Sequence, residues 1–167
     1  LYQVSIDKYR NQCDILQAIS DIRSNRFARD DTMNAMMLNN ICSVLENNTP
    51  LEFVDIQQPN PGPGEILIKV SACGVCHTEL DEIEGRTPPP KMPVVPGHQV
   101  VGIVESMGPD VQMFKTGDRV GVGWIHSSCG NCIHCNAGDE NLCPAFQATG
   151  RDHNGGYAEY FTVDEKF

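Results

Sequence analysis

Four cysteines lie close together in the stretch CGNCIHCNAGDENLC, residues 129–143, with the spacing C-x₂-C-x₂-C-x₇-C. Cysteines this close in sequence allow one loop to wrap four thiolates around a tetrahedral ion. A Zn²⁺ ion bound in this way has every coordination position filled, so it stabilises the fold and leaves no position for a substrate. We therefore predict a structural zinc site formed by Cys129, Cys132, Cys135 and Cys143.

An iron–sulfur cluster is the main alternative for these thiols. The run C-x₂-C-x₂-C, with a last cysteine followed by Pro144, begins and ends as bacterial cluster-binding runs do. Those runs place three residues before the last cysteine, whereas seven are found here, and no second cluster motif occurs. Four structural thiols without a metal are the remaining interpretation, and the density of cysteine disfavours it.

A second pair of metal-binding side chains is further apart in the sequence. Cys76 follows one predicted strand, and His98 opens the next. A thiolate and an imidazole delivered from two strand ends are typical of an open catalytic zinc site. A lone histidine is more often an ordinary core or surface residue, and Cys73 and Cys76 could instead form a redox pair. The redox interpretation needs a thioredoxin-like βαβ unit, and none is predicted.

The elements that must position these residues are mostly strands. Alternating apolar residues and turn-forming Gly and Pro predict strands at 51–56, 65–73, 98–108, 118–124 and 155–163, and a short helix at 76–85. Short strands at close intervals indicate a mainly β (α+β) domain, a partly open antiparallel barrel with few short helices.

Residues 1–32 differ from the rest, because apolar side chains between Tyr9 and Ile22 recur at helical spacing. They form either an N-terminal helical extension with a partner surface or an upstream stretch that is not native to the domain, with Met33 as the true start. We favour the second interpretation. The domain itself is then expected to span residues 33–167.

Composition excludes several classes of function. The 167 residues suit one domain with an appendage, and a net charge of −10 disfavours nucleic acid or an anionic membrane as a partner. No apolar run reaches the roughly 18 residues of a membrane span, and the first residues lack a signal pattern, so we expect a cytoplasmic protein. Clustering of the eight cysteines favours metal over disulfides, and Cys13 and Cys42 are expected to be buried or idle thiols.

Five segments together are similar to zinc-dependent alcohol dehydrogenases of the medium-chain dehydrogenase/reductase superfamily. They are GVCHTELDEIEG, VPGHQVVGIVESMG, GDRVGVG, CGNCIHCNAGDENLC and GGYAEYFTV, in the order and spacing of that family. The resemblance covers about residues 50–167 and implies a GroES-like catalytic domain with a zinc lobe at 129–143.

The resemblance implies roles for individual residues. Cys76 and His98 match the first two ligands of the catalytic zinc, and the four clustered cysteines match the structural zinc. Thr78 matches the hydroxyl that contacts the substrate alcohol and starts a proton relay, and His77 matches a position that contacts the cofactor pyrophosphate. Cys73 matches no ligand. Trp124 either borders the substrate cleft or packs in the core.

The implied activity is NAD(P)-linked oxidation of small alcohols to aldehydes or ketones, and the reverse reaction. Three positions depart from the family pattern near the zinc. Glu79 replaces an aspartate, Gln99 replaces an acid that often follows the ligand histidine, and Asp81 stands where some members carry a relay histidine. The first two are expected to change how the ligands are held, and Gln99 to raise the Lewis acidity of zinc.

The family's third zinc ligand and its Rossmann cofactor domain follow the GGYAEYFTV strand, and neither is found in these 167 residues. We therefore expect a catalytic-domain fragment that is inactive alone. The alternative is a stand-alone zinc-binding β-barrel with a structural or protein-interaction role. Family members are often dimers or tetramers, so a homo-oligomer of the full-length enzyme fits the resemblance.

Overall fold

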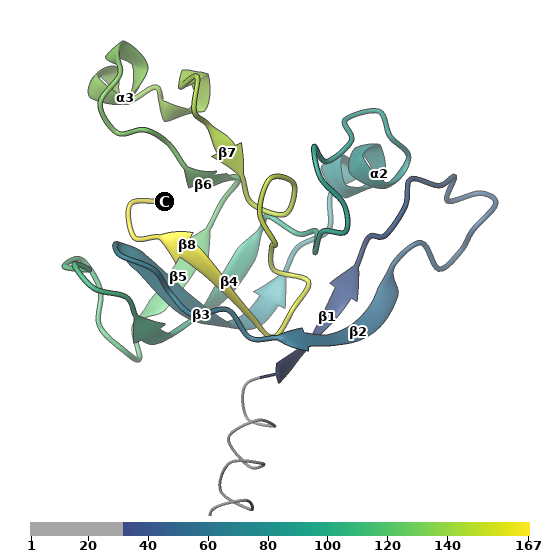
Figure 1. Cartoon of the computed structure of the whole chain (residues 1–167), viewed down its shortest axis with the longest axis horizontal. Helices are drawn as coiled ribbons and strands as arrows, with labels where there is room; N and C mark the ends of the chain where they lie inside the picture. Colours follow the sequence, from purple (N-terminus) through teal and green to yellow (C-terminus); the bar gives the residue numbers. More distant parts are fainter. Residues whose placement is uncertain (1–31) are drawn as a thin grey trace, which may run out of the picture. The chain divides into compact units, whose positions relative to one another are not determined.

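The computed structural model describes residues 32–167, which Figure 1 shows in colour. The elements, in chain order, are β1 (Thr32–Met37), β2 (Glu52–Gln57), β3 (Glu65–Cys73), α2 (His77–Ile83), β4 (Val100–Met107), β5 (Arg119–Val122), β6 (Ile125–Ser127), α3 (Ile133–Ala137), the 3₁₀ helix η2 (Glu140–Leu142), β7 (Gln147–Ala148) and β8 (Tyr160–Asp164). The predicted helix within residues 1–32 lies outside the described part of the chain.

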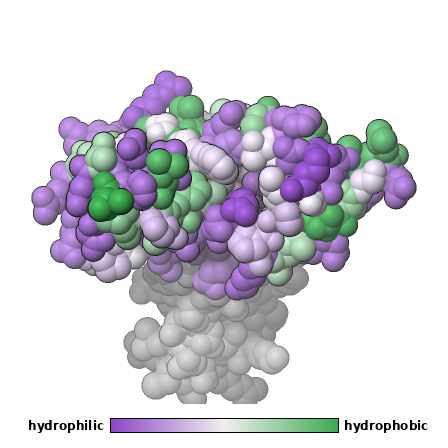
Figure 2. Space-filling view, turned by 90° about the horizontal axis from the view of Figure 1, so that it is seen from above, coloured by the Kyte–Doolittle hydropathy of each residue, from purple (hydrophilic) through white to green (hydrophobic). Residues whose placement is uncertain are grey.

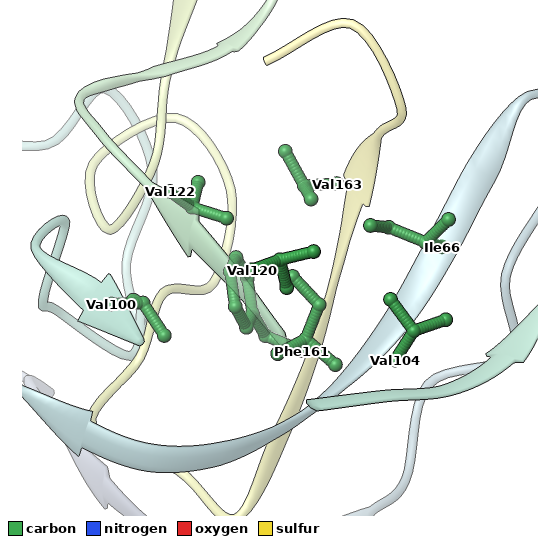
Figure 3. Packing of buried hydrophobic residues seen from close by; sticks show 8 residues of the cluster. Ile66, Val100, Val104, Val120, Val122, Phe161 and Val163 are labelled. Atoms are coloured by element: carbon green, nitrogen blue, oxygen red, sulfur yellow. The ribbon is translucent and has the colours of Figure 1, made fainter. Parts of the chain in front are cut away.

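A four-stranded antiparallel sheet in the order β5-β4-β3-β8 forms the centre of the domain. One of its two inner strands, β3, places Ile68 opposite Val104 on β4 and opposite Phe161 on β8. Apolar side chains from all four strands pack together on one face of this sheet (Figure 3). The cluster consists of Ile66, Ile68, Val100, Val104, Val120, Val122, Phe161 and Val163.

Two further pairs of strands, β1-β2 and β6-β7, complete the sheets of the described residues, and these sheets do not close into a barrel. The prediction of a mainly β domain with few short helices is confirmed. Figure 1 shows α3 at the end of a lobe that projects from the central sheet, well away from α2.

A second apolar cluster anchors α2. Ile83, at the end of the helix, packs with Leu38 and Val94, which exchange backbone hydrogen bonds of 2.8 and 3.1 Å. Because this contact fixes the last turn of α2 against the body of the domain, the first turn is held at the C-terminal end of β3.

The structure differs from the prediction in its shorter elements. The predicted strand at 155–163 begins only at Tyr160, because the two glycines before it pack against another backbone segment. The amide of Gly155 donates to the carbonyl of Val95 at 2.7 Å, and a Cβ on this glycine would lie 2.1 Å from the carbonyl oxygen of Gly97.

The strands β1, β6 and β7 and the helix α3 were not predicted. For β1 the signal existed, since buried Met33 and Ala35 alternate with exposed Asn34.

None of the helices within residues 32–167 combines the length and the apolar character needed to cross a membrane. Figure 2 shows hydrophilic residues spread over one face of the molecule, with the hydrophobic residues in small separate groups.

The packing of the central sheet leads to a stability prediction. Phe161 is 1% exposed on β8, whereas Phe53 is 68% exposed on β2. We expect Phe161→Ala to lower the free energy of unfolding by about 3–5 kcal/mol, because it leaves a cavity in the core. The matched Phe53→Ala variant should change it by less than about 0.5 kcal/mol. Urea unfolding of both variants checks this, and equal losses would show that the core lies elsewhere.

Candidate metal centres

Cys76 is the N-cap of α2 and not the last residue of a strand, since β3 ends at Cys73. Its sulfur accepts a hydrogen bond from the amide of Thr78 at 3.4 Å, and its own amide donates to Glu79 Oε2 at 2.7 Å. These reciprocal bonds form a capping box, which satisfies two of the amide groups that a helix start leaves without partners. The same bonds fix the direction of the Cys76 thiol.

His98 lies two residues before β4, and the glycine before it allows the chain to turn there. Gly97 has a φ of +100°, and a Cβ at this position would lie 2.7 Å from the ring of Tyr157. Only glycine therefore fits, and the tight turn delivers a buried His98 ring to the start of α2.

Cys76 Sγ and His98 Nε2 face each other at a distance of 3.5 Å. Zinc bonds of about 2.3 Å to sulfur and about 2.0 Å to nitrogen, at a tetrahedral angle, place those two atoms about 3.5 Å apart. The pair therefore fits one zinc ion. The structure brings together the two residues that the sequence placed 22 positions apart.

Glu79 contacts the nitrogen of the His98 ring that does not face Cys76. Its Oε1 lies 2.8 Å from His98 Nδ1, and both side chains are buried. The two atoms are close but are not aligned as a hydrogen bond among the described residues, so the carboxylate favours a proton on Nδ1, and a free Nε2 lone pair for a metal, by proximity alone. Cys76, Glu79 and His98 offer ligand atoms within 4.8 Å of one another. Both oxygens of Glu79 already have protein contacts, however, so its geometry suits a residue that orients the ligands.

The remaining predicted residues lie around this pair. Thr78 is half-buried in the first turn of α2, whereas His77 points to the surface with 78% of its side chain exposed. His77 Nε2 lies 3.6 Å from Asp81 Oδ1, and Asp81 also forms an ion pair with Arg86. Gln99 is exposed, and its side chain packs over Gly74. The carboxylate of Glu79 thus lies beside the His98 ring, whereas the side chain of Gln99 packs over Gly74.

The four clustered cysteines converge in the lobe that carries α3 and η2. Their sulfur atoms lie within 4.8 Å of one another. The pairs Cys132–Cys135 and Cys129–Cys143 are each separated by 3.5 Å, and Cys129–Cys135 by 3.9 Å. Four sulfurs at about 2.3 Å from one tetrahedral zinc are about 3.8 Å apart. The cluster therefore fits a single four-coordinate ion.

Hydrogen-bond donors in the lobe lower the pKa of Cys129 and Cys135 and so favour their thiolate forms. At Cys132 the amide of Cys135 acts in the same direction, but desolvation and the neighbouring thiols outweigh it and raise the pKa to about 11. Cys143 Sγ accepts from the amides of Cys129 at 3.4 Å and of Ala145 at 3.3 Å. The backbone amide of Asn131, followed by other nearby donors, lowers the pKa of Cys129 to about 6. Because metals bind thiolates and not thiols, these donors favour metal binding at neutral pH.

A cavity of about 340 Å³ begins beside Thr78, two residues from Cys76. It is lined by Thr78, Asp81, Glu82, Thr87, Trp124 and Arg151. Trp124 is half-exposed at this cavity, and its indole ring contacts the ring of Phe146 edge-on with centroids 5.5 Å apart. Trp124 therefore lines this cavity and is not a core residue.

Glu82 is a residue of this cavity that sequence analysis missed. Its side chain is fully buried, and neither carboxylate oxygen has a hydrogen-bond partner within the described residues. Burial, followed by the charge of Glu79, raises its pKa from 4.5 to about 7. The segment DEIE gives no sign of this, because acidic residues on a short helix usually face solvent.

Two other predicted thiols lie apart from both clusters. Cys73 is half-buried beneath Gly97 and Gly156, consistent with packing, and burial raises its pKa. Cys42 is half-buried against the cluster that anchors α2. His126 stacks on His153 with ring centroids 3.9 Å apart, a contact that sequence analysis also missed.

The raised pKa of Glu82 has a consequence for stability. Ionising this buried carboxyl lowers the stability of the fold, so the penalty is absent below about pH 4.5 and develops as pH rises through about 7. We expect Glu82→Gln to increase the free energy of unfolding by on the order of 2–3 kcal/mol at about pH 8 and by much less at about pH 5. Unfolding by urea at both pH values measures this. A gain that does not depend on pH would contradict it, and Glu84→Gln, at the end of the same helix, is the control.

Comparison with known proteins places this geometry in a family. Residues 62–167 match the model of the alcohol dehydrogenase GroES-like domain. A probable alcohol dehydrogenase of Mycobacterium tuberculosis is 47% identical over 123 residues, which are 71% of this chain and 36% of that protein. The chain thus spans about a third of the length of this relative.

Solved structures give the same result. A thermostable alcohol dehydrogenase from Pyrobaculum aerophilum with cobalt and zinc bound has a TM-score of 0.73 at 34% identity, and the match covers 81% of this chain and 40% of that one. CAD from Helicobacter pylori in complex with NADP(H) has a TM-score of 0.70 at 26% identity, with 81% and 40% covered. The chain therefore belongs to the alcohol dehydrogenase family and carries its GroES-like domain.

Proposed function

We propose that this chain forms the catalytic zinc-binding domain of an NAD(P)-linked alcohol dehydrogenase. The observation that carries the proposal is the approach of Cys76 Sγ to His98 Nε2 at 3.5 Å beside the cavity lined by Thr78. In this proposal Cys76 and His98 are two ligands of a catalytic zinc, and Glu79 orients them. The described residues bring two such ligands together, whereas open zinc sites commonly have three protein ligands. We therefore assign turnover to the full-length enzyme.

The chain's own residues prepare the site for alcohol oxidation. Zinc, when bound, polarises the substrate oxygen and lowers its pKa, and the nicotinamide accepts the hydride. The Thr78 hydroxyl lies at the start of the cavity, where it can accept the proton of the substrate alcohol and donate its own outward. We assign the contact with the cofactor phosphates to His77, whose exposed side chain lies beside Asp81. Trp124 gives the cavity an aromatic wall against which the carbon chain of a substrate can pack.

We assign the second zinc, held by Cys129, Cys132, Cys135 and Cys143, a structural role. Four thiolates complete its coordination, so no position is left for a substrate. A reducing compartment such as the cytoplasm is proposed for the enzyme, since these residues must stay thiolates and not disulfides.

The structural assignment can be tested by metal analysis. We expect Cys132→Ser to remove one zinc ion per chain and to lower the melting temperature, because three ligands bind zinc more weakly and the lobe depends on it. Cys42→Ser, at a thiol outside both clusters, should keep the zinc content of the wild type. Inductively coupled plasma analysis gives the stoichiometry. Equal zinc in the two variants would rule out the four-cysteine site.

The relay role of Thr78 can be tested in the full-length enzyme. We expect Thr78→Ala to lower kcat for alcohol oxidation by about 10²-fold or more, because the proton loses its first acceptor. Thr78→Ser keeps the hydroxyl and should stay within about tenfold of the wild type. Steady-state formation of reduced nicotinamide measures both. Similar rates for the two variants would remove Thr78 from the relay.

A further inference from the structure

Two short loops carry the ligands of the proposed catalytic zinc. Residues 74–76 connect β3 to α2 and end at Cys76, and residues 95–99 lead into β4 and contain His98. Val75, in the first loop, is 76% exposed, so its side chain does not anchor that loop in the core. Glu79 holds Cys76 from the side of α2. The approach to Cys76 from β3 must therefore be fixed by other contacts.

Tyr157 contacts both loops. Its hydroxyl donates to the carbonyl of Gly74 at 3.2 Å, two residues before Cys76. Its backbone amide donates to the carbonyl of Pro96 at 3.0 Å, two residues before His98. A single residue that is far from either ligand in the sequence thus joins the backbone segments that lead into both of them.

The ring of Tyr157 limits the space available to the turn before His98. A Cβ at Gly97 would lie 2.7 Å from this ring and 2.9 Å from Cys73 Sγ. The turn is therefore packed so closely that even one added carbon has no room. Because ring and turn are in such close contact, a shift of the Tyr157 ring would move the backbone that carries His98.

Gly74 is held at both of its backbone polar groups. Its amide donates to the carbonyl of Gln99 at 2.8 Å, which joins the two loops directly, and its carbonyl accepts from Tyr157. Cys73 Sγ also approaches this carbonyl, but at 3.6 Å and as a weak donor. Removal of the tyrosine hydroxyl would leave the carbonyl with the thiol alone, in a loop that the exposed Val75 does not anchor.

The hydroxyl of Tyr157 is directed at the ligand loop and not at the core. The apolar cluster of the central sheet does not include Tyr157, and the acceptor of its hydroxyl lies between β3 and α2. A phenylalanine would occupy the same space without this hydrogen bond. The effect of losing the bond should therefore appear in the loop that ends at Cys76.

We propose that Tyr157 is a positioning residue for the open metal site, acting through Gly74 on Cys76 and through the turn at Gly97 on His98. This inference rests on the proposed function and adds a residue to its zinc site. Tyr157 acts through the backbone and not by contact with zinc, cofactor or substrate. It complements Glu79, which holds the same two ligands from α2.

The test titrates Co²⁺ into full-length enzyme whose four-cysteine lobe holds zinc, at a temperature at which every variant is folded. We expect Tyr157→Phe to weaken cobalt affinity at the open site by about 3–10-fold, the effect of losing one hydrogen bond of ordinary strength. The thiolate-to-cobalt absorption band should also shift, because the Cys76 thiolate is less well held.

Tyr160→Phe is the matched control. It removes a tyrosine hydroxyl from β8, where the ring centroid lies 5.9 Å from Lys69 Nζ, and should leave cobalt affinity within about twofold of the wild type. A tyrosine that only stabilises the fold does not change metal affinity in folded protein. Cobalt affinity within twofold of the wild type in Tyr157→Phe would therefore overturn the proposal, as would an equal loss in Tyr160→Phe.

Alcohol oxidation by the zinc-loaded wild type separates this inference from the proposed function. Absence of turnover, together with weaker cobalt binding in Tyr157→Phe, would overturn the dehydrogenase proposal and support the positioning role. Turnover by a wild type whose Tyr157→Phe variant binds cobalt equally well would overturn the role of Tyr157 alone. A wild type that binds no cobalt outside the lobe would overturn both.

Discussion

The carboxylate of Glu79 is the group on which the geometry of the site depends. One oxygen accepts from the amide of Cys76 at 2.7 Å, and the other lies 2.8 Å from His98 Nδ1. A single side chain thus joins the start of α2 to the turn before β4. Because it is buried, water competes little for these contacts. The facing of Cys76 Sγ and His98 Nε2 follows from them, and the cavity then has a fixed position relative to the metal ligands.

The rest of the fold supports that contact from both sides. On one side, Ile83 packs with Leu38 and Val94 and holds the far end of α2. On the other, the backbone of residues 155–157 packs against residues 95–97, so that the turn at Gly97 keeps His98 pointing inward. The lobe with the four cysteines projects from this framework, and its sulfur atoms lie close enough together to hold a metal ion. Buried acids on the inner face of α2 lower the stability of the fold, and such a loss is common where residues serve function.

Sequence patterns predicted the two groups of metal-binding residues better than the local contacts and short elements around them. The four cysteines of the lobe could be found because a C-x₂-C-x₂-C-x₇-C run needs only local chain geometry. Cys76 and His98 could be paired only by their places beside two predicted strands and by the family resemblance, since nothing local shows that the two meet. The capping role of Cys76 was missed, because cysteine is an unusual N-cap residue. The burial of Glu82 depends on tertiary packing around α2, which an acidic segment such as DEIE does not reveal. The strands β6 and β7 are too short for an alternating pattern to be recognised.

Cobalt titration tests most directly whether Glu79 positions Cys76 and His98 around a metal. In full-length enzyme whose four-cysteine lobe holds zinc, we expect one further Co²⁺ to bind with a thiolate-to-cobalt absorption band. The band should disappear in Cys76→Ser, and Glu79→Gln should weaken cobalt affinity by about 10–100-fold while keeping the thiolate band. A band that survives Cys76→Ser, or an affinity that Glu79→Gln leaves unchanged, would contradict this account of the site.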